Sequence, residues 1–182
     1  MNEKIFESFP VLKTENLIFR RMEEKDMQGI YNFYSDPQSM QYIARNLLTD
    51  MEQAIEKLKI FNQLFDNKNG IWWAFNKKDE EKFIGFGGFF EVDKEANKAE
   101  LGYGLLHGNW GKGFGTEAVK KLTEFGLNEL QLHKIYAYVD PENKASVKLL
   151  ENFGYEREGL FKDHDYAQNK YFDTAVYTLM NK

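Results

Sequence analysis

Hydrophobic and polar residues recur along the first third of the chain in patterns that predict a strand and two helices. The apolar and basic stretch at 14–22 suits a strand. The segment after it has one apolar face at the three- and four-residue spacing of a helix, made by Met27, Ile30, Tyr31 and Tyr34. The Asp-Pro pair at 36–37 should end this helix, because proline disfavours helical backbone in the residue before it. A second helix fits 49–66, with Thr49 or Asp50 as its cap.

The middle of the chain changes from helical spacing to strands and back again. Three apolar segments rich in aromatic residues predict strands at 70–75, 82–90 and 99–106. Polar or charged turns separate these segments, at 76–81 and 93–98. The helical spacing then returns between Gly113 and about Leu130.

The C-terminal part of the chain predicts a strand, a helix and a closing pair of strands. The strand lies at 133–139. The Asp-Pro pair at 140–141 should begin the helix, because aspartate suits the cap and proline the first helical position. Gly154 should end it, and 155–180 fits two strands with a polar hairpin at roughly 164–170. This order of elements predicts one mixed α/β sheet with helices on its faces.

Composition agrees with a single folded domain over 1–182. A chain of 182 residues, of which 42% are hydrophobic and 16% aromatic, can fill one core, and this excludes global disorder. The chain has 24 basic and 29 acidic residues, a net charge of −5, and no basic stripe, so we expect no nucleic-acid partner. Mild acidity suits a cationic partner such as an amine.

The numbers and positions of cysteine and histidine residues limit the kinds of catalytic and metal sites that the chain can form. There is no cysteine, which excludes disulfides, thiolate nucleophiles and cysteine-ligated metals. The three histidines lack the i, i+4 spacing of a metal-binding helix, so we expect no metal site. No stretch resembles a signal peptide or approaches the length of a membrane span, so we expect a cytoplasmic protein without a membrane partner.

The most informative stretch is the glycine-rich segment Trp110–Thr116, hereafter the glycine loop, at the start of a predicted helix. Its three alternating glycines allow backbone conformations in which successive N–H groups point into one concavity. The helix N-terminus behind it adds partial positive charge, so the loop favours a pyrophosphate. The spacing matches neither the dinucleotide fingerprint nor a P-loop. A glycine-rich turn without a ligand is the alternative interpretation.

Four blocks of sequence, in order and each in fitting local structure, carry a family resemblance. They are 12–20 with Ser35-Asp36-Pro37, then Ala99–Tyr103, then Trp110–Ala118, and finally Asn143–Ser146 with Glu151–Tyr155. Together they cover almost the whole chain and resemble the GNAT superfamily of acetyltransferases. Within it, they are most similar to the branch that includes ribosomal-protein N-terminal acetyltransferases. Trp110 departs from the pattern, because much of the superfamily has Gln or Arg at that point.

The resemblance implies a GNAT fold and acetyl-CoA as the co-substrate. The fold would have a mixed sheet of about seven strands and about four helices, splayed between the fourth strand, 99–106, and the fifth, 133–139. The pantetheine arm would enter this gap and contact Tyr103, Gly104, Leu105 and Asn143. The pyrophosphate would bind residues of the glycine loop, namely Gly111, Lys112, Gly113, Phe114, Gly115 and Thr116.

Without cysteine, direct attack of the amine on the acetyl thioester is the simplest route. The attacking amine must be neutral, which an α-amine with a pKa of about 8 achieves more easily than a lysine with a pKa of about 10.4. Glu100, on the strand beside the gap, is the first candidate base, and an ion pair or hydrogen bond that orders the strand is its alternative role. Asp165 is the second candidate, and a solvated turn aspartate is its alternative.

The reaction also needs donors to an oxyanion and a proton for the leaving thiolate. Backbone N–H groups of Gly104 and Leu105 are the natural oxyanion donors. Many superfamily members place a tyrosine in the helix after the fifth strand as the acid, where this chain has Leu150. Ser146, one helical turn after Asn143, is the substitute, and close packing of a small polar residue is its alternative role.

These observations predict an acetyl-CoA-dependent N-acetyltransferase that acts on a primary amine, either a peptide N-terminus or a small amine. The departure at Leu150 leaves open a second function, a catalytically silent acyl-CoA-binding sensor. A third is an enzyme of another class that binds a nucleotide phosphate at the glycine loop. The oligomeric state is also open, with a homo-oligomer among the alternatives.

Overall fold

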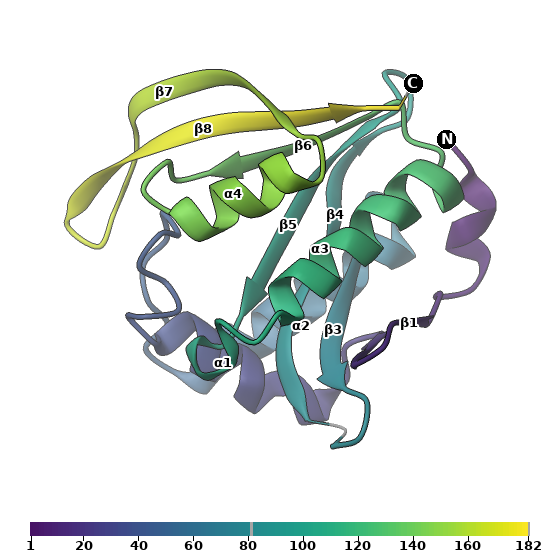
Figure 1. The fold of residues 1–182 in the computed structure, drawn as a ribbon. Helices are drawn as coiled ribbons and strands as arrows, with labels where there is room; N and C mark the ends of the chain where they lie inside the picture. The colour runs from purple at the N-terminus through teal and green to yellow at the C-terminus, as the bar shows by residue number, and fades with distance from the viewer. Residues whose placement is uncertain (81, 182) are drawn as a thin grey trace.

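The computed structural model describes residues 1–80 and 82–181 and shows a twisted sheet with helices on both faces (Figure 1). In this part of the chain, eight strands form one sheet in the order β1-β2-β3-β4-β5-β6-β8-β7. The strands are β1 (Leu12–Lys13), β2 (Leu17–Arg20), β3 (Ile71–Lys77), β4 (Phe83–Asp93), β5 (Lys98–Leu105), β6 (Lys134–Val139), β7 (Glu156–Ala167) and β8 (Lys170–Met180). The α-helices are α1 (Met27–Ser35), α2 (Met51–Asp66), α3 (Phe114–Glu124) and α4 (Lys144–Asn152). Short 3-10 turns lie at Glu3–Glu7, Glu24–Asp26 and His107–Asn109, and α3 continues into a π-helical turn at Phe125–Glu129.

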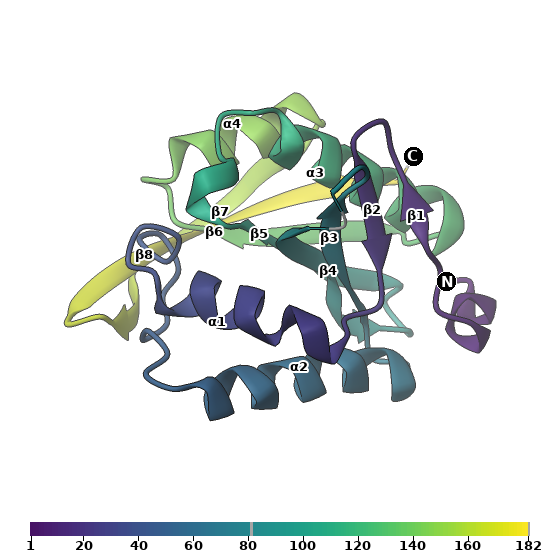
Figure 2. The ribbon, with the colours of Figure 1, turned by 90° about the horizontal axis from the view of Figure 1, so that it is seen from below.

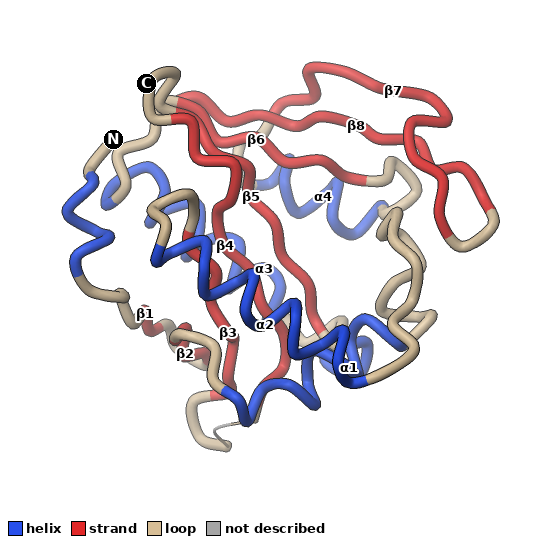
Figure 3. Tube along the Cα trace, turned by 180° about the vertical axis from the view of Figure 1, so that it is seen from behind, coloured by secondary structure: helices blue, strands red, loops and turns tan. Residues whose placement is uncertain are grey.

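Strands β5 and β6 separate along most of their length. They are parallel, whereas the other neighbouring strands of the described sheet are antiparallel. Their pairing covers Lys98–Glu100 against Lys134–Tyr136. Beyond Glu100, β5 continues to Leu105 paired with β4 on its other side. The two strands diverge visibly in Figure 3, which confirms the splay expected between 99–106 and 133–139.

The two faces of the sheet are covered by different helix pairs. Figure 2 shows α3 and α4 over one face and α1 and α2 over the other. Side chains along β5 alternate between these faces. Leu101 and Tyr103 contact the core beneath α3 and α4. A Cβ added at Gly104 would overlap the ring of Phe33 in α1. Glu100 shares the parity of Gly104 and therefore lies on the α1–α2 face.

Several helix boundaries follow the local signals in the sequence. α1 ends at Ser35, directly before the Asp-Pro pair at 36–37. Asp50 caps α2, because its carboxylate accepts a hydrogen bond from the backbone N–H of Gln53 at 3.0 Å. Gly154, with a φ of 82°, takes the left-handed conformation just after α4.

The helix that the sequence predicts from 140–141 begins later, at Lys144. The Asp140 carboxylate accepts a hydrogen bond from the N–H of Glu142 at 2.8 Å, which forms a turn instead of a helix cap. Asn143 is the cap of α4, and its side-chain oxygen accepts from the N–H of Ser146 at 3.1 Å. The aspartate therefore stabilises a local turn that competes with helix formation at this point.

Strands at both ends of the chain also differ from expectation. A turn in which the N–H of Thr14 donates to the carbonyl of Leu17 at 3.0 Å separates β1 from β2, so one predicted strand is two. The expected hairpin at 164–170 narrows to Gln168 and Asn169, whose φ values of 51° and 59° fit a two-residue turn. The predicted turn at 76–81 includes Glu81, which lies outside the described residues.

Candidate active site

The glycine loop continues into the first turn of α3, which begins at Phe114. Gly111 and Gly113 have φ values of 71° and 84°, which favour glycine. A Cβ at either position would meet no described atom within 4 Å, so the backbone conformation and not crowding requires glycine there. Gly115 lies in the first turn of α3 without a left-handed φ, so the expectation of an unusual conformation at all three glycines does not hold for it.

The backbone at the start of α3 offers hydrogen-bond donors. The first backbone bond of the helix joins the N–H of Glu117 to the carbonyl of Gly113 at 3.0 Å. The N–H groups of Phe114, Gly115 and Thr116 precede this bond and have no acceptor within the helix. Aligned peptide dipoles add partial positive charge at the same end. The loop therefore has the chemistry of an anion site, and a pyrophosphate fits it.

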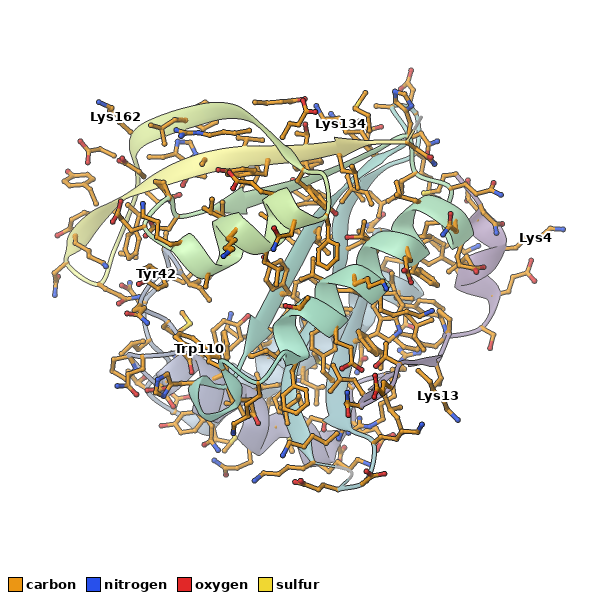
Figure 4. The ribbon with its side chains drawn as sticks, in the orientation of Figure 1. Lys4, Lys13, Tyr42, Trp110, Lys134 and Lys162 are labelled. Carbon is orange, nitrogen blue, oxygen red and sulfur yellow. The ribbon has the colours of Figure 1, made fainter. Side chains whose placement is uncertain are left out.

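Trp110 ties the glycine loop to the end of β5. Its indole N–H donates to the carbonyl of Leu105 at 2.8 Å, and the ring packs edge-on against His107 with 5.0 Å between centroids. The Lys112 ammonium donates to the carbonyl of Gly108 at 2.6 Å. Figure 4 shows Trp110 beside the N-terminal end of α3. From the sequence alone, Trp110 only replaces the polar side chain that much of the superfamily has at this point. In the fold, its hydrogen bond joins the glycine loop to the end of β5.

A cavity of about 810 Å³ lies where β5 and β6 separate. On the α4 side its wall includes Tyr103, Asn143 and Ser146, and on the other side it includes Phe33 of α1 and Lys57 of α2. Because these residues come from opposite faces of the sheet, the cavity connects the two faces through the splay.

The cavity gathers five of the residues that the sequence predicts for the site. These are Glu100, Tyr103, Asn143, Ser146 and Asp165. The glycine loop does not line the cavity, and neither do Gly104 and Leu105. Asn143 is the cap of α4, and the hydrogen bond that its side-chain oxygen accepts from the N–H of Ser146 fixes this residue at the cavity wall.

Two hydroxyl groups meet on the α4 side of the cavity. The Tyr103 hydroxyl lies 2.6 Å from Ser146 Oγ, and either group can donate the hydrogen bond. Burial raises the pKa of the Tyr103 phenol to about 12, so it stays protonated at neutral pH. The sequence suggested only backbone contacts for Tyr103. No local pattern links its hydroxyl to Ser146, because the two residues belong to β5 and α4.

Glu100 lies on the opposite side of the gap from this hydroxyl pair. Burial raises the pKa of its carboxyl to about 8, repulsion from Glu91 adds to the increase, and Arg45 opposes it. None of the ion pairs in the described part of the chain includes Glu100, so the alternative role as an ion-pair partner is not seen.

Glu91 is a site residue that the sequence did not reveal. It lies where the β4–β5 register shifts and has a φ of 50°, an uncommon conformation for a residue other than glycine. Its carboxylate accepts a hydrogen bond from the Tyr136 hydroxyl at 3.3 Å. Only the bulge and the neighbouring strands bring it to the cavity with Glu100, so no motif in the sequence could have indicated it.

Asp165 reaches the cavity from β7. It is half-buried in the strand, and its carboxylate accepts a hydrogen bond from the Thr174 hydroxyl at 3.1 Å. The register between β7 and β8 shifts just before it, and His164 and Asp173 line the cavity nearby. The alternative role as a solvated turn aspartate is therefore wrong.

The polar groups of the site are hydroxyls, carboxyls and backbone N–H groups. Among the described residues, no group of three or more His, Asp or Glu side chains is placed to hold a metal ion. In the same part of the chain, no helix combines the length and the apolar character needed to cross a membrane.

The sequence as a whole matches a known family. The family described as acetyltransferase (GNAT) domain matches residues 16–156, which include β5, the glycine loop, β6 and α4. The chain belongs to the GNAT acetyltransferase family. The resemblance and the fold predicted from the sequence are both confirmed.

Individual relatives agree with this assignment. An uncharacterized N-acetyltransferase, p20, from Bacillus licheniformis is 35% identical over 171 residues, with 94% of this chain and 96% of the relative covered. The ribosomal protein uS5-alanine N-acetyltransferase of Escherichia coli (strain K12) is 24% identical over 180 residues, with 92% and 89% covered. The crystal structure of spermidine N-acetyltransferase from Vibrio cholerae in complex with CoA and spermine has a TM-score of 0.81 at 21% identity, with 92% of this chain and 97% of that one covered. At that identity the likeness is one of fold.

As a GNAT acetyltransferase, the protein is an enzyme that transfers acetyl groups to amines. The alternative of another enzyme class with a nucleotide phosphate at the glycine loop is wrong. The roles of individual site residues stay predictions.

Proposed function

We propose that this GNAT acetyltransferase transfers the acetyl group directly to a primary amine that binds on the α1–α2 side of the splay. The acceptor is the α-amine of a peptide or of a small molecule. One observation carries the proposal. The cavity passes through the sheet with a hydroxyl pair, Tyr103 and Ser146, on one side and the carboxyl of Glu100 on the other.

The residues around the splay fit acetyl-CoA. The N–H groups of Phe114, Gly115 and Thr116 have no acceptor within α3, and they suit its pyrophosphate. The edge of β5 beyond Glu100 has no strand of the described residues beside it. In our proposal, the backbone groups of Tyr103 and Leu105 that point to this edge bond the pantetheine arm as they would a strand, whereas those of Gly104 point to β4. Asn143 lines the gap from α4. Acetyl-CoA supplies an activated acetyl thioester at this position.

Proton transfer is divided between the two sides of the gap. In our proposal, Glu100 accepts the proton that the amine loses as its nitrogen bonds the acetyl carbon. Ser146 gives its hydroxyl proton to the departing sulfur and recovers one from solvent, while Tyr103 holds the Ser146 hydroxyl in place at 2.6 Å. The backbone N–H of Leu105, on the open edge of β5, is the donor to the oxyanion in this proposal, because the N–H of Gly104 points to β4 instead. Asp165 lines the same cavity and is the alternative base.

The raised pKa of Glu100 favours a particular kind of acceptor. A base with a pKa of about 8 is matched to an α-amine, whose pKa is also about 8, and poorly matched to a lysine at about 10.4. Because Glu100 is mostly protonated at neutral pH, its basic form increases as the pH rises. Activity should therefore rise through about pH 8.

Release of free thiol from acetyl-CoA, measured with a panel of peptides, amino acids and small amines, tests the proposal. We expect turnover that depends on the amine, with an about hundredfold or greater loss in Glu100→Gln. Asp165→Asn distinguishes the two candidate bases, because this variant should keep most of the wild-type turnover rate if Glu100 is the base. Binding of acetyl-CoA without turnover on any amine would favour the silent sensor instead.

A further inference from the structure

Two cations, Arg45 and Lys57, line the cavity on its α1–α2 side. Arg45 belongs to the loop between α1 and α2, and Lys57 lies near the middle of α2. The Lys57 ammonium lies 4.2 Å from the centroid of the buried Tyr34 ring. This cation–π contact stabilises the ammonium at the wall of the cavity.

Neither cation has an acidic partner in the described part of the chain. No carboxylate there lies within 4 Å of Arg45 or Lys57. Asp165 and Asp173 of the cavity accept hydrogen bonds within the β7–β8 hairpin, and Glu91 accepts one from β6. Burial and repulsion from Arg45 lower the pKa of Lys57. Two like charges at one wall, neither in an ion pair within the described residues, favour the binding of an anion.

The β7–β8 hairpin holds the loop that carries Arg45. The side-chain amide of Gln168 donates to the carbonyls of Met40, Ile43 and Arg45 at 3.1, 3.1 and 3.0 Å. The backbone N–H of Gln168 donates to the side-chain oxygen of Asn46 at 2.9 Å. Figure 1 shows the loop after α1 beside the tip of the hairpin. A loop held in this way loses less conformational entropy when a ligand binds.

The cations are not placed for the diphosphate of acetyl-CoA. The glycine loop leads into α3, which covers the opposite face of the sheet from α2 (Figure 2), and the loop does not line the cavity. Glu100 lies on the same face as the cations and is close enough for Arg45 to affect it electrostatically. The acceptor side of the cavity therefore has a carboxyl group suited to an amine and a cationic wall suited to an anion.

We propose that Arg45 and Lys57 form an anion subsite, and that the acceptor is a primary amine that also carries a carboxylate, as an amino acid or an acidic peptide does. The inference rests on the proposed function, because it places the amine beside Glu100. The carboxylate of the acceptor then pairs with the two cations. A diamine would instead bring a second positive charge to the cationic wall, where it is repelled.

The test compares amines that differ only in the group at the far end. The acceptors are C-terminally amidated dipeptides that share an N-terminal glycine α-amine: the acidic Gly-Glu and Gly-Asp, the neutral Gly-Gln and Gly-Asn, and the cationic Gly-Lys. Each is assayed for kcat/KM with the full-length wild type, Arg45→Met and Lys57→Met. Methionine keeps the length and the apolar stem of the side chain. Lys59→Met is the matched control, because Lys59 is exposed on α2 and does not line the cavity.

We expect the wild type to prefer the acidic dipeptides over the neutral and the cationic ones. Arg45→Met and Lys57→Met should each lower the ratio of kcat/KM for the acidic dipeptide to kcat/KM for its neutral counterpart about tenfold or more, whereas Lys59→Met should keep the wild-type ratio. The ratio is used because Arg45 also affects the pKa of Glu100, which changes the rate for both acceptors alike. Preference of the wild type for the cationic or the neutral dipeptides would overturn the proposal. The proposal would also be overturned if Arg45→Met and Lys57→Met lowered this preference no more than Lys59→Met does.

Failure of the proposed function can be distinguished from failure of this inference. If no amine is acetylated, the proposed function fails, and binding of glutarate measured by calorimetry then decides on the subsite. Binding to the wild type and to Lys59→Met that is lost in Lys57→Met would support an anion subsite without catalysis. Absent binding, or equal binding to all three proteins, would overturn it.

Discussion

Replacing Glu100 with glutamine should make the protein more stable and less active at the same time. Burial and repulsion from Glu91 raise the pKa of Glu100 from 4.5 to about 8. Between these values the unfolded chain releases this proton while the folded protein keeps it. The stability that the protonated group provides is therefore complete below about pH 4.5 and is progressively lost as the pH rises to about 8. Glutamine resembles the protonated group and has no proton to lose.

The size of the effect follows from the difference between the two pKa values. At about 1.36 kcal/mol per pH unit, the wild type loses about 3 kcal/mol relative to Glu100→Gln by pH 7, and about 5 kcal/mol above pH 8. These are upper values, because water in the cavity screens the ionised carboxylate.

Urea unfolding of the wild type and the variant at pH 5, 7 and 9 measures this difference. We expect the stability advantage of Glu100→Gln to grow with pH, while the exposed Glu95→Gln control shows no such trend. In parallel, kcat/KM calculated for the neutral form of the amine should rise through about pH 8 in the wild type, and it should be low and flat in the variant. An advantage that does not grow with pH, or a variant less stable than the wild type at pH 9, would refute the reasoning about Glu100.

Three further predictions concern the acetyl-CoA side of the splay. Gly113→Val should weaken acetyl-CoA binding at least tenfold, because a β-branched residue resists a φ of 84°. The control Gly108→Ala, in the preceding turn, should bind acetyl-CoA as the wild type does when both are measured by calorimetry. Equal affinities of the two variants would count against the glycine loop as the binding site. Ser146→Ala and Tyr103→Phe should each lower kcat about tenfold or more, with little change in the Kd of acetyl-CoA. Unchanged single-turnover rates would show that the two hydroxyl groups contribute only to packing. Trp110→Phe should raise the Kd of acetyl-CoA by up to about tenfold through loss of one hydrogen bond at the end of β5; an unchanged Kd would show that the loop keeps its shape without it.

Much of the fold could be predicted from the sequence, because the signals involved are local. The alternation of apolar residues sets the type of each element within a few residues. Caps and stops such as Asp50, Pro37 and Gly154 act on their nearest neighbours, so their effects do not depend on the rest of the chain. Where two local signals compete, as at Asp140, the sequence alone predicts the wrong start for a helix.

The sequence by itself determined the order of elements, the glycine loop and most of the candidate residues, since each depends on residues that are adjacent along the chain. Only the tertiary structure decided which side of the gap each group occupies. Tyr103 meets Ser146 from another element, Glu91 reaches the cavity through a bulge, and Arg45 and Lys57 come together from a loop and a helix. These pairings depend on the splay of the sheet and on the packing of helices against its two faces. No local spacing in the sequence encodes such long-range contacts, and for this reason the chemistry of the acceptor side was visible only in the folded protein.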